Sequence, residues 1–211
     1  MSKKIYNLIV LDESGSMGVI KESIIDGFRT LAHKLISIGV EMPNQEHFIS
    51  LVTFNGMGIK NRLNKQPVVE LAEISHKSYV PDSTTPLYDA ICKSVLMLKH
   101  DLHEQEDYAV LVTVITDGVE NASTEFTQKE TKLLIENMSK DPRWGFGLIG
   151  AGIDLQSTAG SLSIPIQRTL EFERHAESVK KMFNRYANAQ HTMSSVMSCH
   201  GNFHDDDVSF K

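Results

Sequence analysis

The stretch IYNLIVLDESGSM, residues 5–17, decides the fold of this chain. Its first seven residues are apolar or aromatic except for Asn7. A short run of this kind, without polar alternation, is typical of a strand in a parallel sheet that helices cover on both faces. Asp12 follows the run at once, and Ser14 and Ser16 come next. A carboxylate contributes little to packing at that point, so we expect this strand end to serve a binding site.

Other parts of the chain also have the composition of strands. Tyr108–Thr116 and Trp144–Gly150 are continuous apolar runs like the first, and they are rich in valine, isoleucine or aromatic residues. The remaining expected strands are Phe48–Phe54, Thr169–Phe172 and a short edge segment, Ile59–Leu63.

Between these runs, apolar residues recur at intervals of three and four, which is the pattern of helices with one buried face. A stripe from Ile20 to Ile38 predicts a long first helix, which we expect Gly39 to end. Further helices are expected from Leu87, just after Pro86, to Leu102, over Gln128–Met138, and from Ala176 onward. Strands that alternate with helices predict an α/β fold with a doubly wound parallel sheet.

Composition limits the class of protein. The 211 residues include 21 Lys and Arg and 27 Asp and Glu, so the formal net charge is −6 at pH 7. A surface that binds nucleic acid or an anionic membrane normally has a basic excess, which this chain lacks. No segment approaches the roughly 18–20 apolar residues of a membrane span. We expect one domain over residues 1–200, with neither nucleic acid nor a membrane as a partner.

The cysteines and the two ends of the chain indicate the compartment. Two cysteines, Cys92 and Cys199, cannot form a disulfide framework, so we expect reduced thiols. The apolar run from Ile5 is too short for a signal-peptide core, and Asp12 interrupts it. These features favour a cytoplasmic protein. Residues 201–211 contain three consecutive aspartates and are expected to form a disordered acidic tail.

Three segments are expected to bring oxygen ligands to one edge of the sheet, because open α/β sheets bind ligands at the carboxyl ends of their strands. Oxygen ligands without His or Cys favour a hard cation, Mg²⁺ or Mn²⁺. We expect hydroxyls to bind it directly and carboxylates to act through water, which leaves one coordination position open. The candidate metal residues are Asp12, Ser14, Ser16, Thr85 and Asp117.

These segments resemble the von Willebrand factor A-type (vWA) domain. The matching motifs are Asp-x-Ser-x-Ser at residues 12–16, Thr85 before a helix, and Thr-Asp-Gly at residues 116–118. In that family the three pieces build a metal-ion-dependent adhesion site. The resemblance implies a six-stranded sheet with one antiparallel edge strand, helices on both faces, and Mg²⁺ at the top. One departure is that Ser83 and Thr84 stand where many members have two glycines.

The resemblance also implies a function. A protein partner's Asp or Glu would fill the open metal position, so the chain is expected to be a binding domain and not an enzyme. Family members inside bacterial cells act as adaptors beside ATPases or in stress-response systems, which are partners of the kind expected here. We place Glu13, Glu120 and Asn121 on the partner-binding rim of the site.

Two simpler interpretations of the loop explain less. Ser16 could cap the first helix, but capping does not account for Asp117 or Thr85. A Ca²⁺ loop of the EF-hand kind fails, because Met17 stands at its glycine position and Ser23 at the position of its bidentate glutamate.

An enzyme on the same scaffold is the alternative function. Asp12 would then be the nucleophile of a metal-dependent phosphohydrolase. Such a site usually needs a lysine to hold phosphate and a nearby acid or base, and the Asp12 loop offers no basic residue before Lys21.

Overall fold

Six strands form one sheet in the computed structural model, which describes residues 2–71, 74–200 and 209–210. The strands lie in the order β3-β2-β1-β4-β5-β6, and β3 alone runs antiparallel to its neighbour. The predicted doubly wound, mostly parallel sheet is confirmed. The strands are β1 (Lys3–Asp12), β2 (Gln45–Asn55), β3 (Gly58–Pro67), β4 (Tyr108–Thr116), β5 (Trp144–Gly150) and β6 (Thr169–Glu171).

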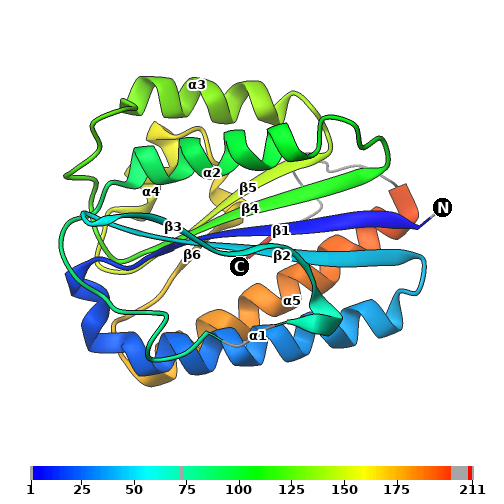
Figure 1. The fold of residues 1–211 in the computed structure, drawn as a ribbon, viewed down its shortest axis with the longest axis horizontal. Coiled ribbons are helices and arrows are strands. Elements are labelled where there is room, and N and C mark those ends of the chain that lie inside the picture. The colour runs from blue at the N-terminus through cyan, green and yellow to red at the C-terminus, as the bar shows by residue number, and fades with distance from the viewer. Residues whose placement is uncertain (1, 72–73, 201–208, 211) are drawn as a thin grey trace.

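Helices cover both faces of this sheet, with α1 and α5 on one side and α2 and α3 on the other (Figure 1). No helix in the described part of the chain is long and apolar enough to cross a membrane. The α-helices are α1 (Lys21–Glu41), α2 (Leu87–Asp101), α3 (Gln128–Ser139), α4 (Leu155–Ser161) and α5 (Ala176–His200). Short 3₁₀ turns are η1 (Gly15–Ile20), η2 (Val68–Glu70) and η3 (Ile166–Arg168).

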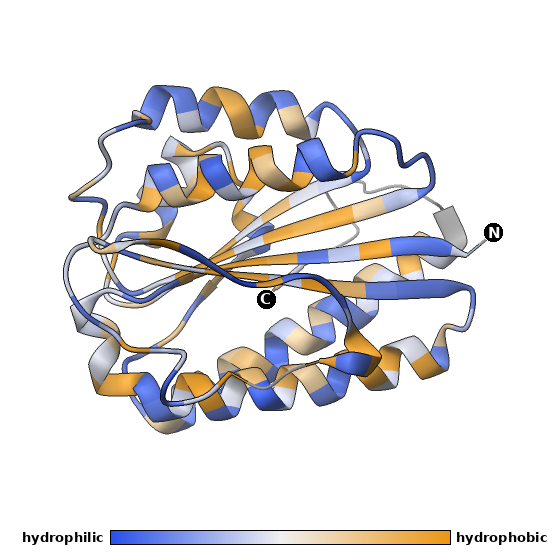
Figure 2. Cartoon of the chain, in the orientation of Figure 1, coloured by the Kyte–Doolittle hydropathy of each residue, from blue (hydrophilic) through white to orange (hydrophobic). Residues whose placement is uncertain are grey.

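The apolar residues of β1 divide between two cores because successive side chains of a strand point to opposite faces. Ile5 and Ile9 belong to the core beneath α1 and α5, whereas Leu8 and Val10 belong to the core beneath α2 and α3. Hydrophobic colour accordingly runs along the central strands, and polar colour lies on the outer faces of the helices (Figure 2).

Several boundaries differ from the sequence prediction. The first helix continues through Gly39 and ends at Glu41, shortly before Pro43. A residue that precedes proline is disfavoured in the helical region, so Pro43 explains this end better than the glycine does. The expected segments Phe48–Phe54 and Ile59–Leu63 are both longer, because β2 and β3 form one hairpin whose backbone pairing extends into polar sequence.

Helix α4 was absent from the prediction. It has seven residues, too few for a periodic apolar stripe, and its only fully buried member is Ala159. Its beginning does carry a local signal, since the Asp154 side chain accepts a hydrogen bond from the backbone N–H of Ser157.

The end of the chain corrects one expectation. Of the predicted disordered tail, residues 201–208 and 211 lie outside the described residues. Phe210 is described and buried, with its ring 5.7 Å from that of Tyr186 and its backbone N–H donating to the Gln167 carbonyl. This part of the expected tail therefore packs into the domain, because its aromatic side chain fills a space above Gly147.

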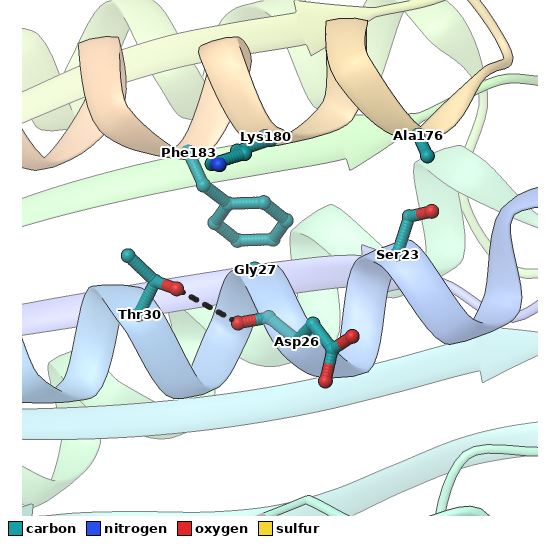
Figure 3. A pocket seen from close by; sticks show the side chains of 7 residues that line it. All are labelled: Ser23, Asp26, Gly27, Thr30, Ala176, Lys180 and Phe183. Atoms are coloured by element: carbon teal, nitrogen blue, oxygen red, sulfur yellow. Dashed lines mark hydrogen bonds between the residues drawn. The ribbon is translucent and has the colours of Figure 1, made fainter.

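The contact between α1 and α5 depends on Gly27. A Cβ added there would lie 2.0 Å from a ring carbon of Phe183, so only glycine lets the two helices approach with this ring between them. A hollow of about 310 Å³ lies beside this contact. Ser23 and Lys180 are among the residues that line it (Figure 3). Its lining shares no residue with the candidate metal site.

The path of the chain creates a switch point beside β1. From β1 the chain forms β2 and β3 on one side, and it then crosses to β4 on the other side. Strand order therefore reverses between β1 and β4, and a ligand site is expected outside their carboxyl ends. Asp12 ends β1 and Asp117 follows β4, so both carboxylates lie at this point.

Candidate metal site

Asp12 is buried where β1 ends, and neighbouring donors hold both of its carboxylate oxygens. Oδ1 accepts a 2.7 Å hydrogen bond from the backbone N–H of Ser14, and Oδ2 accepts a 2.6 Å bond from the Thr116 hydroxyl. Burial raises the pKa of Asp12, the bonds from Thr116 and Ser14 oppose that shift, and the charge of Asp117 adds to it. The carboxylate thus has a fixed orientation, and a positive charge beside it would stabilise its ionised form.

The hydroxyls of Ser14 and Ser16 lie close to each other, and that of Ser16 also contacts Asp117. The two Oγ atoms lie 3.3 Å apart, and the Ser16 hydroxyl is 2.5 Å from Asp117 Oδ1, to which it donates. Because the hydrogen of Ser16 is directed to the carboxylate, its oxygen lone pairs are left to accept from, or bind, another group.

Thr85 reaches the site from a separate loop. Its backbone N–H donates to Asn121 Oδ1 at 2.8 Å, and its carbonyl accepts from the N–H of Asn121 at 3.2 Å. A Cβ added to Gly118 would lie 2.8 Å from Thr85 Oγ1 and 3.5 Å from Asp12 Oδ2. The hydroxyl and the carboxylate therefore border the same space, which only glycine at position 118 leaves open.

The neighbouring Thr84 faces elsewhere. Its hydroxyl lies toward the β2–β3 hairpin, where a Cβ on Gly56 would come within 2.2 Å of it. Ser83 adopts a left-handed backbone conformation, φ 67°, that glycine adopts more easily. The glycine-free sequence before Thr85 thus keeps a turn of the glycine type, and the turn directs Thr85 rather than Thr84 inward.

Glu13 is not on the exposed rim, and its prediction as a rim residue was wrong. Its side chain is fully buried, because its carboxylate pairs with Arg62 at 3.1 Å and accepts a 2.6 Å hydrogen bond from the backbone N–H of Val80. Glu13 therefore anchors the loop that leads to Thr85.

The other two rim residues also hold the loops in place. Glu120 is half-buried and accepts hydrogen bonds from the backbone N–H groups of Tyr88, at the start of α2, and of Ala122 and Ser123. Asn121 is exposed, yet its amide oxygen is used by Thr85. Contact of either residue with a partner stays a prediction.

Three residues that contact the site were not found from sequence. Thr116 holds Asp12, and the Tyr79 hydroxyl donates a 2.8 Å bond to the backbone carbonyl of Asp12. Burial raises the pKa of Tyr79 well above its ordinary value, with Asp12, Glu13 and Asp117 adding to the shift. Arg174 pairs with Asp117, with its Nε 2.9 Å from Oδ2. Only Thr116 had a sequence signal, its place beside Asp117.

The residues fit a hard divalent cation. Adjacent ligands of an octahedral ion with bonds of about 2.1 Å lie about 3.0 Å apart, close to the separation of the Ser14 and Ser16 oxygens. Asp117 Oδ2 is buried, and within the described residues it is ion-paired with Arg174 but accepts no well-aligned hydrogen bond. No group of three or more His, Cys, Asp or Glu suited to a metal occurs in that same part of the chain, so binding would depend on hydroxyl oxygens.

Comparison with known proteins gave matches by structure alone. No family model matches the sequence, and no curated protein matches it either. Among solved structures, the VWA domain of SpRpn10 has a TM-score of 0.57 at 14% identity, over 86% of this chain and 94% of that domain. The fold is therefore that of vWA domains.

Two similar structures contain metal. Proximal thread matrix protein 1 of the mussel byssus, with a zinc-occupied metal-ion-dependent adhesion motif, has a TM-score of 0.60 at 12% identity over 90% of this chain. The chain spans only 46% of that protein. Manganese-loaded TRAP protein of Plasmodium vivax has a TM-score of 0.58 at 18% identity, over 85% of this chain and 71% of that one. At these low identities, the similarities show a shared fold alone.

Proposed function

We propose that the chain is a protein-interaction domain in which a divalent ion, Mg²⁺ or Mn²⁺, captures an Asp or Glu side chain of a protein partner. One observation carries the proposal: three separate loops bring hydroxyl and carboxylate oxygens together at the switch point between β1 and β4. Ser14 and Ser16 would bind the ion directly with Thr85, and Asp12 and Asp117 would hold its waters. The ion supplies the positive charge that a partner's carboxylate needs.

The surface around the site supports a protein as the partner. Nine large apolar side chains are exposed in the described residues, and four of them stand in the segments that follow β1, join β2 to β3, precede α2 and follow β4. We call these four the apolar rim. They are Val19, Met57, Val80 and Val119, which are 79%, 74%, 51% and 68% exposed.

Short connections tie the apolar rim to the candidate ligands. Val119 is two residues from Asp117, and the backbone of Val80 is bonded to Glu13, beside Asp12. Met57 follows Gly56, whose N–H donates to the carbonyl of Thr84. Exposed apolar side chains grouped on one face mark protein contact surfaces, so a partner would present a carboxylate within an apolar patch.

The phosphohydrolase alternative lacks support from the contacts of the site. Within the described residues, neither Asp12 nor Asp117 has a His or Lys neighbour that could transfer a proton. The basic group at the site, Arg174, is already paired with Asp117, and Asp12 has both oxygens in hydrogen bonds. We propose that the chain has no catalytic activity. A cytoplasmic location and a partner from an ATPase or stress-response system stay part of the proposal.

Affinity capture on the full chain tests the function. The immobilised protein should retain a partner in Mg²⁺ and release it in EDTA, and Ser14→Ala should lose the same partner. Ser37→Ala, an exposed serine on α1, is the matched control and should behave as the wild type. A partner set that neither EDTA nor Ser14→Ala changes would reject capture through the metal.

A further inference from the structure

Arg174 brings a fixed positive charge to the candidate metal site from the loop between β6 and α5. Its Nε lies 2.9 Å from Asp117 Oδ2, and its Nη2 donates to the backbone carbonyl of the same residue. The Asp117 side chain is fully buried, whereas that of Arg174 is 42% exposed. Within the described residues, no other basic side chain contacts Asp12 or Asp117.

The position of the guanidinium is accommodated by its surroundings. Gly152, in the loop after β5, has φ +65°, and a Cβ added to it would lie 3.0 Å from Arg174 Nη2. Any other residue at 152 would adopt this backbone conformation with strain and would also crowd the guanidinium. Three loops, after β4, β5 and β6, therefore meet at the pair formed by Arg174 and Asp117.

The charges of the site suggest what this pair does. Asp12 and Asp117 place two negative charges in a poorly solvated place, and Arg174 compensates one of them. A divalent ion beside Ser16 would draw on the same carboxylate, since Asp117 Oδ1 is already bonded to that serine. Two cations that share one carboxylate repel each other, and each weakens the other's attraction to it.

We propose that Arg174 and the divalent ion are alternative counter-ions of Asp117. Arg174 neutralises the carboxylate and holds the loop between β6 and α5 when no ion is bound, and it lowers the affinity of the site for divalent ions. By linkage, ion binding loosens Arg174 from Asp117 to the same degree. This inference rests on the proposed metal site.

Calorimetric titration of the full chain with Mn²⁺ alone, in the absence of any partner, tests the competition. Arg174→Gln removes the charge and should bind Mn²⁺ more tightly by at least about fivefold, the low end of typical coupling between two sites. Arg174→Lys keeps a charge without the planar fork and should fall between the two. Arg143→Gln is the control, because Arg143 pairs with Asp141 at 2.7 Å before β5, at the opposite edge of the sheet.

A second readout follows Arg174 itself. Its side-chain Nε–H signal in a ¹H–¹⁵N spectrum, assigned by its loss in Arg174→Gln, should move when Mg²⁺ is added to the wild type. Equal or weaker Mn²⁺ binding by Arg174→Gln would overturn the inference while leaving the metal site in place. If neither the wild type nor this variant binds Mn²⁺, the proposed function fails, and the inference with it.

Discussion

The hydroxyl of Ser16 donates a 2.5 Å hydrogen bond to Asp117 Oδ1, across 101 residues of sequence. This bond joins the loop after β1 to the end of β4, the two places at which the sheet reverses its strand order. It also leaves the serine oxygen free to bind a cation, so one contact serves both the fold and the proposed site.

Divalent ions should stabilise the folded chain, because an ion that binds only the native state adds free energy of unfolding by mass action. At 100 times its dissociation constant the gain is about 2.7 kcal/mol. Thermal unfolding with Mg²⁺ or Mn²⁺ should show a higher Tm for the wild type and for Ser37→Ala. No rise is expected for Ser14→Ala combined with Ser16→Ala, and a rise equal to that of the wild type would contradict the ligand assignment.

Gly118→Ala should weaken metal binding at least about tenfold, because the added methyl group would lie 2.8 Å from Thr85 Oγ1 and displace it. Crowding of this kind should also cost about 1–3 kcal/mol of stability. Gly18→Ala is the matched control, since nothing lies within 4 Å of the Cβ it would add. Mn²⁺ titration and urea unfolding of both variants check the prediction, which fails if the two behave alike.

Glu13→Gln should destabilise the chain by about 2 kcal/mol, because it removes a buried charge that accepts from Val80 and pairs with Arg62. Glu104→Gln, at a side chain that is 85% exposed, should change the stability little. Urea unfolding measures both. A Glu13→Gln variant as stable as the wild type would restore the interpretation of Glu13 as a rim residue.

His47 should make the fold less stable in mild acid. Burial lowers its pKa from 6.5 to about 4, and neither ring nitrogen has a hydrogen-bond partner within the described residues. Between these two values the unfolded chain binds the proton and the folded chain does not. Stability therefore falls as the pH drops from 6.5 towards 4, by up to about 3 kcal/mol in total.

The variant His47→Leu isolates this contribution from that of other groups that titrate in the same range. The difference in free energy of unfolding between pH 7 and pH 5 should be smaller in the variant than in the wild type. Equal differences in the two proteins would mean that His47 is not the group responsible.

The apolar rim should contribute to partner capture without contributing to metal binding. Met57→Ser and Val119→Ser remove exposed apolar surface, so they should lower retention of a captured partner and leave Mn²⁺ affinity unchanged. Val40→Ser, which is 75% exposed near the end of α1, is the control. Retention that is reduced equally by all three changes would argue against a specific role for the rim.

Much of the fold could be predicted from the sequence because strands and helices leave local patterns of apolar residues. Buried strands appear as apolar runs and covered helices as stripes of period 3.6, so β1, β4, β5, α1 and α2 could be predicted with small boundary errors. Helix α4 was missed because seven residues hold too little periodicity. The candidate ligands in residues 12–16 and 116–118 could be recognised from the sequence because each segment comes at the end of an apolar strand.

The tertiary structure alone decided which side chains meet. The burial of Glu13, the bond from Tyr79 to Asp12 and the pair of Arg174 with Asp117 join residues that lie far apart in the chain. Each contact depends on how loops of irregular conformation fold over the end of the sheet, and no periodic pattern encodes such a path. By itself, the sequence determined the class of fold and named the oxygen-bearing side chains that are candidate ligands. Packing of the loops determined which charge stands beside Asp117, and whether Glu13 faces solvent or the interior.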